Sequence, residues 1–279
     1  MSHKDIHRRF LHNAGLIVGG RVTFGLMNLA TNAIILRAFG AADLGMVMLL
    51  VAYIRLFAEV VKFESWQAVL RFGVIAQDRG EDNQLRRLIG LALSVDVITM
   101  LLAIIASILL IPYAAAWFGW NDQITAIAPW FMILIIFVTN ATPNGVLRLF
   151  DRVEIIALQH GINAVIRFVL VLLAVLLGGS VLHLAWAWFA AFVISGSVTM
   201  IVCAYELIKR DLRPLISLRW HKTGRIFPGI WHFLLMSNLI SSGPMLVTHV
   251  TTLFIGAQLG SAQVAVLQLA RQIASGIST

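Results

Sequence analysis

Hydrophobic residues run through this chain of 279 residues in eight long stretches, which are separated by short polar segments. Each stretch approaches the roughly 20 mostly apolar residues that an α-helix needs to cross a bilayer. The pattern therefore predicts eight membrane-spanning helices, over residues 11–36, 44–70, 88–111, 124–147, 155–177, 181–207, 230–255 and 263–279. Pro129 and Pro143 predict bends in the fourth helix, because proline removes a backbone hydrogen bond.

The composition supports a membrane protein. Hydrophobic residues make up 59% of the chain and charged residues 12%, whereas ordinary soluble domains carry about 25% charged residues. We therefore expect an all-α polytopic membrane protein. The formal net charge of +8 does not indicate a nucleic-acid partner, because the basic residues are spread along helices and short loops rather than over one soluble domain.

The basic residues are distributed unevenly between the two sides of the predicted bundle. Most of the 21 Lys and Arg residues fall at the N-terminus and in the loops after the second, fourth and sixth helices, namely Lys4, Arg8, Arg9, Arg71, Arg79, Arg86, Arg87, Arg148, Arg152, Lys209, Arg210, Arg213, Arg219, Lys222 and Arg225. The loops on the other side hold Arg37. Because short loops rich in Lys and Arg stay in the cytoplasm, the N-terminus is predicted to be cytoplasmic.

Two turns indicate an internal repeat. Small residues at Gly40 and Gly45 match those at Gly260 and Ala265 in spacing. An even number of helices before the second turn gives parallel repeats, which are related by an axis along the membrane normal. We therefore predict a six-helix N-terminal lobe over residues 1–210, a basic cytoplasmic linker over 211–228, and the first two helices of a second lobe over 229–279. Since the last predicted helix stops in mid-pattern, the second lobe is expected to be truncated.

Five basic residues lie inside predicted helices, and they are the candidate substrate-binding residues: Arg21, Arg55, Lys62, Arg167 and Arg271. A charge at the bilayer centre costs about 2.5–3.5 kcal/mol on insertion scales, so such residues face a bundle interior or a watery cavity and mark a substrate path. Arginine suits an anionic ligand, because its planar guanidinium donates several hydrogen bonds to phosphate or carboxylate oxygens.

A structural role is the alternative for part of this set. Arg55, Glu59 and Lys62 are spaced i, i+4 and i+7, which places them on one face of the second predicted helix together with Trp66. Glu59 can pair with both bases and tie helices together. Asp96, on the third helix, can pair with the arginine of the first helix or serve as an ion or proton site that couples transport.

Several segments carry a family resemblance: Gly19-Gly20-Arg21, Leu36-Arg37-Ala38-Phe39-Gly40, Ser65-Trp66-Gln67-Ala68-Val69-Leu70-Arg71-Phe72, Gly145-Val146-Leu147-Arg148-Leu149-Phe150-Asp151-Arg152 and Gly260-Ser261-Ala262-Gln263-Val264-Ala265. They resemble the polysaccharide transporter branch, which includes O-antigen and lipid-linked oligosaccharide flippases, of the multidrug/oligosaccharidyl-lipid/polysaccharide flippase superfamily. The resemblance implies two six-helix lobes around a central cavity, in the inner membrane of a bacterium. It also implies translocation of an undecaprenyl-pyrophosphate-linked glycan for lipopolysaccharide or exopolysaccharide biosynthesis. The implied partners are the lipid-linked anionic oligosaccharide, membrane lipid and polysaccharide-assembly proteins.

Other functions fit the sequence less well. The chain shows no Gly-rich phosphate loop and no His/Cys metal cluster, so we expect no cofactor, no metal and no enzymatic activity. A multidrug exporter of the same superfamily is one alternative, but cationic drugs favour acidic cavity residues, and the predicted helices hold five bases against Glu59, Glu64 and Asp96. An integral-membrane glycan polymerase or ligase is another alternative, which a long periplasmic loop would favour and which none of the predicted loops supports.

Overall fold

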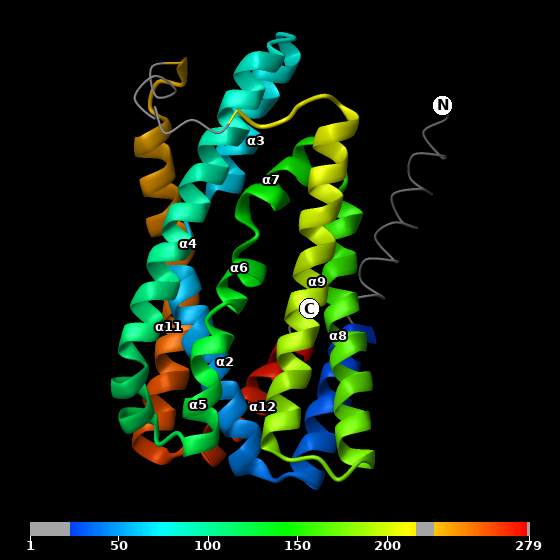
Figure 1. Ribbon diagram of the computed structural model, residues 1–279, viewed down its shortest axis with the longest axis vertical. Helices are drawn as coiled ribbons and strands as arrows, with labels where there is room; N and C mark the ends of the chain where they lie inside the picture. Colours follow the sequence, from blue (N-terminus) through cyan, green and yellow to red (C-terminus); the bar gives the residue numbers. More distant parts are fainter. Residues whose placement is uncertain (1–22, 216–225, 278–279) are drawn as a thin grey trace.

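The computed structural model describes residues 23–215 and 226–277, and all regular structure in these residues is helical. The expected all-α polytopic fold is therefore confirmed. The helices run along the long axis of an elongated bundle, with α8 and α9 side by side and α4 beside α11 (Figure 1). The candidate residue Arg21 and the first part of the first predicted helix lie outside the described residues, and the remainder of that helix occupies residues 23–38.

The helix bounds match the hydrophobic pattern in most places. After residues 23–38 come α2 (Ala41–Val61), α3 (Ser65–Asp78), α4 (Asp82–Phe118), α5 (Asp122–Phe131), α6 (Leu134–Thr139), α7 (Ala141–Leu149), α8 (Val153–Leu176), α9 (Val181–Lys209), α11 (Ile230–Leu259) and α12 (Ser261–Ile277). Among the described residues, five helices are long and apolar enough to span a membrane, and one bent pair makes a sixth candidate span. The fifth, sixth and seventh predicted helices agree closely with α8, α9 and α11.

The second predicted helix is broken, so its prediction as one continuous span over 44–70 is wrong. Helix α2 ends at Val61, and Lys62 takes an extended conformation with ψ 102° before α3 begins at Ser65. The break frees the carbonyl of Lys62, which accepts a hydrogen bond from the side-chain amide of Asn238 on α11. Trp66 therefore lies on a different helix from Arg55, and the single polar face expected from their spacing does not form.

The fourth predicted helix is divided into α5, α6 and α7. The chain bends by 58° between α5 and the segment that contains α6 and α7, shortly after Pro129. A further break falls at Asn140, whose φ of 20° ends α6 and precedes α7. Pro143 does not itself bend a helix, because it lies in the first turn of α7, where a missing N–H costs little.

The two turns that suggested a repeat have the same backbone conformation. Gly40 and Gly260 both have φ 88° and ψ 171°, and each directly precedes a helix, α2 or α12. The two helices begin in contact, because a Cβ on Gly45 would lie 1.8 Å from the carbonyl oxygen of Ser261. This close approach requires glycine at position 45.

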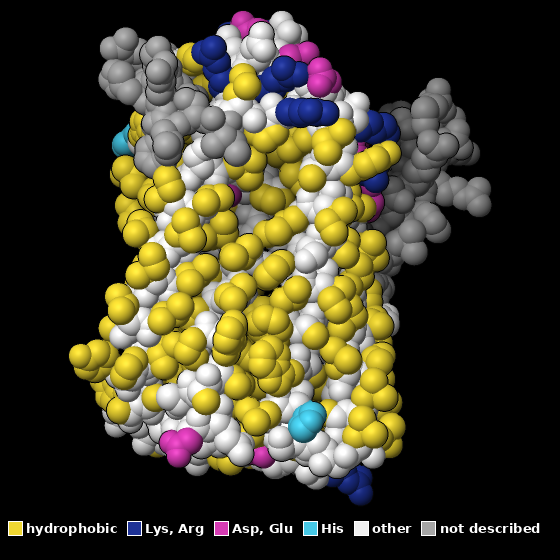
Figure 2. Space-filling view, in the orientation of Figure 1, with side chains coloured by type: hydrophobic (Ala, Val, Ile, Leu, Met, Phe, Trp, Pro, Cys, Tyr) yellow, Lys and Arg dark blue, Asp and Glu magenta, His cyan; other side chains and the backbone are white. Residues whose placement is uncertain are grey.

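Charge is concentrated at one end of the molecule. Lys and Arg side chains gather there, while hydrophobic side chains cover most of the length of the visible face (Figure 2). This basic end contains the turn between α7 and α8 and the end of α9, where buried Glu206 lies 3.2 Å from Arg152 and 2.9 Å from Arg210. The one-sided pattern of basic residues found in the sequence is therefore also a spatial one.

Candidate functional site

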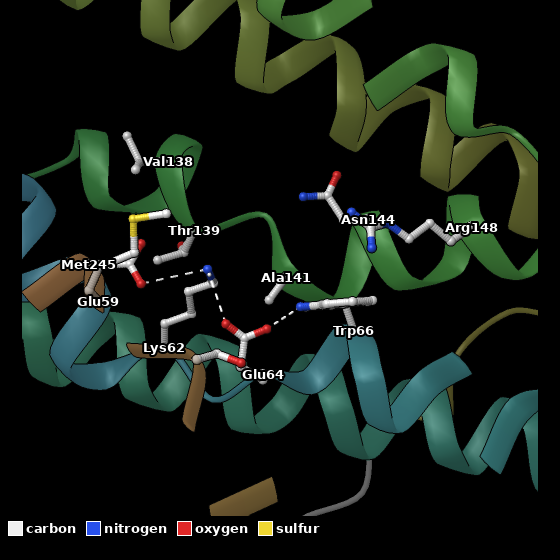
Figure 3. A pocket seen from close by; sticks show the side chains of 11 residues that line it. Glu59, Lys62, Glu64, Trp66, Val138, Thr139, Ala141, Asn144, Arg148 and Met245 are labelled. Atoms are coloured by element: carbon white, nitrogen blue, oxygen red, sulfur yellow. Dashed lines mark hydrogen bonds and ion pairs between the residues drawn. The ribbon is translucent and has the colours of Figure 1, made fainter. Parts of the chain in front are cut away.

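A polar pocket of about 320 Å³ lies where the break between α2 and α3 faces the break between α6 and α7 (Figure 3). Helix α11 contributes Ser241 and Met245 to its wall. We define the polar pocket by its lining residues, which are Glu59, Lys62, Glu64, Trp66, Val138, Thr139, Ala141, Asn144, Arg148, Ser241 and Met245. The structure thus brings two sequence-predicted residues, Glu59 and Lys62, into one cavity.

Lys62 is surrounded by acidic partners in this pocket. Its Nζ lies 3.3 Å from Glu64 Oε1 and 3.7 Å from Glu59 Oε2. Glu64 is only 4% exposed, and it also accepts a hydrogen bond from the indole N–H of Trp66 (Figure 3). The expected Glu59–Lys62 ion pair is therefore present, and the positive charge of Lys62 is balanced by two carboxylates.

Arg148 is a further basic residue of the polar pocket that sequence reasoning did not assign to a site. Its guanidinium lies over the ring of Trp66, with 4.1 Å between Cζ and the ring centroid. Among the described residues, no carboxylate forms an ion pair with it. Because Arg148 lies at the end of a predicted helix, it was counted in the sequence among the basic residues that set the membrane orientation. The available hint was that Arg148 and Trp66 both belong to the segments that carry the family resemblance.

Asp96 joins the two helix breaks. Its Oδ2 accepts a hydrogen bond of 3.0 Å from the hydroxyl of Ser65, the first residue of α3, and one of 2.9 Å from the backbone N–H of Thr142 in the first turn of α7. The hydroxyls of Ser65 and Thr142 lie 3.2 Å apart. A carboxylate is stabilised at these positions because helix N-termini present unpaired N–H groups and a positive dipole end. The alternative pairing of Asp96 with Arg21 falls outside the described residues.

Three other candidate bases form a second group, which we call the arginine row: Arg55 on α2, Arg167 on α8 and Arg271 on α12. Arg55 lies over the ring of Phe192, with 5.6 Å between Cζ and the centroid. Arg167 lies over Trp188 at 4.8 Å and donates a hydrogen bond to Asn28 Oδ1. Each of these contacts is with a neutral partner.

Arg271 completes the row from α12. Its Nη1 donates to Thr252 Oγ1 at 2.9 Å and to the carbonyl oxygen of Thr248 at 3.3 Å, and both partners lie on α11. No ion pair to a carboxylate is present for any arginine of the row within the part of the chain that the structure describes. Arg55 and Glu59 thus make no direct ion pair, although Glu59 is close enough to act on Arg55 electrostatically.

Two arginines of the row lie at a similar depth, and Arg55, about 21 Å from the start of α2, lies roughly one helical turn nearer the basic end. Arg167, Arg271 and His249 are each about 15 Å, or roughly three helical turns, from the ends of their helices opposite the basic end. Arg55 is close enough to Arg167 and to His249 to act on both electrostatically, and Arg271 acts on His249. The row does not line the polar pocket, so the single constellation expected from the sequence is divided into two groups.

No group of three or more His, Cys, Asp or Glu side chains in the described part of the chain is arranged to hold a metal ion. The polar chemistry that remains is ionic and hydrogen-bonding. It consists of basic side chains, a balanced ion-pair cluster and broken helices. Such an arrangement can bind and release a charged solute without forming a covalent bond.

Comparisons with known proteins identify a family. The sequence profile of a family described as "Polysaccharide biosynthesis protein" matches residues 10–279. The inner membrane protein YghQ of Escherichia coli (strain K12) is 24% identical over 276 aligned residues, which cover 94% of this chain and 74% of the relative.

A solved structure has a similar fold. It is an inward-facing multidrug resistance MATE family transporter of the MOP superfamily, with a TM-score of 0.63 and 22% identity. The match covers 90% of this chain, which spans 57% of the length of that transporter. At this level of identity the likeness concerns the fold alone.

Proposed function

We propose that this chain, which belongs to the polysaccharide biosynthesis protein family, takes part in moving a lipid-linked anionic oligosaccharide across the bacterial inner membrane. Family membership and the transporter fold support transport rather than catalysis. The inner-membrane location of the relative YghQ supports the same membrane for this chain. In this proposal the ligand is a pyrophosphate-linked or acidic glycan, with membrane lipid around it.

The observation that carries the proposal is that no arginine of the row forms a direct ion pair with a described carboxylate, although Glu59 acts on Arg55 electrostatically from the same helix. Arg55, Arg167 and Arg271 project from three helices and contact aromatic rings, an amide and a hydroxyl. The buried Nε of Arg167 has no hydrogen-bond partner among the described residues. Since an unpaired cation in low dielectric attracts an anion strongly, this group is suited to bind phosphate or carboxylate oxygens.

The polar pocket has a different role from the arginine row in the proposed function. Lys62 contributes less to anion binding, because Glu59 and Glu64 already balance its charge. Arg148 carries a positive charge that no described carboxylate balances, and its guanidinium, with the other hydrogen-bonding groups of the pocket, suits the oxygens of a glycan. We therefore assign the anionic group of the ligand to the arginine row and place part of the glycan in the polar pocket.

The domain arrangement remains part of the proposal. We assign residues 1–210 to a first lobe and residues 229–279 to the start of a second lobe, with a linker over 211–228. Polar contacts join the two across their boundary, including Asn32 to Gln272 at 2.8 Å and Gln67 to Ser241 at 3.2 Å. Small residues and exchangeable hydrogen bonds suit an interface that must slide or rock during transport.

The orientation is also proposed, with the basic end in the cytoplasm. Reporter fusions test it directly: a periplasm-dependent phosphatase fused after Trp120 should be active, and the same fusion after Gly80 should be inactive. Activity at Gly80 would reverse the orientation. Polysaccharide-assembly proteins are expected partners, and co-purification with this chain would identify them.

A multidrug exporter is less well supported, because the interior bases outnumber the acids that a cationic drug would need. A glycan polymerase or ligase is also less well supported, for a different reason. The described connections at the end opposite the basic end are short, as between α4 and α5 or between α8 and α9, and leave little room for an extramembrane catalytic surface.

The proposal is tested by replacing row residues in the native gene and measuring surface polysaccharide and membrane abundance together. Arg55→Ala and Arg167→Ala should reduce export at least tenfold with normal abundance, since a hydrogen bond to a charged group contributes about 1.5–3 kcal/mol. Arg167→Lys should retain part of the activity. The matched control is Arg37→Ala, which removes an exposed charge from the turn before Gly40 and should export normally. Wild-type export in both Ala variants would reject the proposal.

A further inference from the structure

A second cavity of about 470 Å³ lies between α4 and α9, on the face that Figure 2 shows hollowed toward the basic end. We call it the apolar groove and define it by its lining residues, which are Leu93, Asp96, Val97, Met100, Ile136, Thr139, Asn140, Ala141, Pro143, Met200, Cys203, Ala204, Leu207, Ile208, Arg213 and Pro214. It follows about the last three turns of α9. In the proposed orientation it lies in the cytoplasmic half of the bilayer.

The groove offers almost no polar atoms to a ligand. Oδ2 of Asp96 already accepts from Ser65 and Thr142, and the hydroxyl of Thr139 donates to the carbonyl oxygen of Ile135 at 2.7 Å. The remaining wall is mostly aliphatic. A concave apolar surface of this kind at membrane depth is filled by hydrocarbon, because water there would lose its hydrogen bonds.

One basic residue lies in the lining, besides the carboxylate of Asp96. Arg213 follows the end of α9 and is exposed, and no described carboxylate forms an ion pair with it. Its neighbour Asp211 pairs instead with Arg86, at 3.0 Å. A hydrocarbon chain in the groove would therefore place its head group near a guanidinium that no described carboxylate pairs with, which favours a lipid with a phosphate over a neutral one.

The groove and the polar pocket share a wall. Thr139 and Ala141 line both cavities, and Asn140 between them has the unusual φ of 20°. The wall is thus the helix break itself rather than a packed helix. This adjacency favours the substrate lipid over bulk phospholipid as the occupant, because an amphiphile held here lies directly beside the pocket assigned to its glycan.

We propose that the apolar groove is the access site for the polyprenyl chain of the substrate, with the lipid phosphate at Arg213. This inference rests on the proposed function and adds the route by which the lipid part approaches. The chain of the lipid lies between α4 and α9, and the head group is positioned to reach the polar pocket past the break at Asn140.

The test uses a photoreactive benzophenone side chain placed at Ala204, which lines the groove and is exposed. The control position is Ile201, which is 67% exposed on the same helix and lies outside the groove lining. The protein is reconstituted in phosphatidylcholine vesicles that contain labelled undecaprenyl phosphate. We expect saturable cross-linking to this lipid at position 204 and cross-linking in proportion to its mole fraction at position 201. Proportional cross-linking at both positions would overturn the proposal, because bulk lipid would then fill the groove.

Arg213→Ala tests the phosphate position in the same vesicles. It should raise the half-saturating mole fraction of undecaprenyl phosphate at least fivefold. Lys209→Ala removes an equal charge from the same end of α9, outside the groove lining, and should change it less than twofold. Equal effects of the two variants would overturn the assignment of the head group to Arg213.

Export by the Ala204→Trp variant separates this inference from the proposed function. A Trp side chain fills the groove without entering the packed core, so export should fall at least tenfold while Ile201→Trp exports normally. If Ala204→Trp exports normally but the arginine-row variants do not, the groove proposal fails and the proposed function stands. If the row variants export normally, the proposed function itself fails.

Discussion

The polar pocket and the arginine row both place basic side chains inside a membrane protein, yet they stabilise those charges in different ways. Lys62 has two carboxylates within ion-pair distance, whereas Arg55 and Arg167 lie over aromatic rings. An ion pair neutralises the positive charge of a base, whereas an aromatic ring face leaves most of that charge available to another partner. From this difference we expect a buried base to be available to a ligand where no described carboxylate pairs with it.

The two regions also differ in their backbone. The polar pocket is built on broken helices, whose free N–H and C=O groups need partners such as Asp96. The arginine row lies on helices that are continuous at those positions, α2, α8 and α12. Substitutions in the pocket should therefore lower stability, whereas substitutions in the row should lower ligand binding.

The largest expected effect on stability is at the junction of the helix breaks. Asp96→Ala removes two hydrogen bonds to a buried carboxylate and leaves the N–H of Thr142 unpaired, so we expect a loss of about 3–6 kcal/mol. The melting temperature in detergent and the membrane abundance should both fall sharply. Asp96→Asn keeps one acceptor and should lose less. An Asp96→Ala protein that melts like the wild type would remove the distinction between the two regions.

Substitution of Gly45 tests whether the arginine row needs the contact between α2 and α12, without changing a residue of the row. A Cβ there would lie 1.8 Å from the Ser261 carbonyl oxygen, so Gly45→Ala should push α2 and α12 apart and separate Arg55 from Arg271. Overpacking of this kind costs about 1–3 kcal/mol. Export should fall as well, because the row is displaced while the polar pocket stays intact.

The control for this variant is Gly25→Ala, since a Cβ at Gly25 meets no atom within 4 Å. It should match the wild type in melting temperature and in export. If Gly45→Ala behaves in the same way, the contact between the starts of α2 and α12 does not position the row.

A double-mutant cycle on Lys62 and Glu64 should give the smallest effect. The Lys62 side chain is partly exposed and the Glu64 side chain is buried. Lys62 keeps its ion pair with Glu59 when Glu64 is replaced. We expect a coupling energy of about 0.5–1.5 kcal/mol from the melting curves of the two single Ala variants and the double variant. Additive losses would show that Glu64 does not stabilise Lys62, and Glu59 would then be the single acidic partner among the described residues that balances its charge.

Sequence reasoning identified the fold class and most spans, because long apolar stretches have few other uses and basic residues accumulate at one end. It failed at the breaks near Lys62 and Asn140. A break inside an apolar stretch depends on partners far along the chain, such as Asn238 and Asp96, which hydrophobicity does not record.

The same limit applied to the site. Arg55, Arg167 and Arg271 were selected as candidates because a base in an apolar stretch is conspicuous. The sequence did not predict that these arginines lie in a different group from Lys62. Helical spacing suggested one face for Arg55 and Lys62, but α2 ends before Lys62 and that face is interrupted. Arg148 was missed because its position at a helix end also fits an orientation signal.

The most direct test of the account measures binding of undecaprenyl pyrophosphate to the purified protein in lipid nanodiscs, by the shift in melting temperature with ligand concentration. Arg167→Ala should weaken binding about tenfold or more, in line with a lost charge-assisted contact of roughly 1.5–3 kcal/mol. Lys62→Ala should change it less than about threefold, because that charge is already paired. Equal losses in the two variants, or wild-type binding by Arg167→Ala, would contradict the claim that the arginine row holds the free charge.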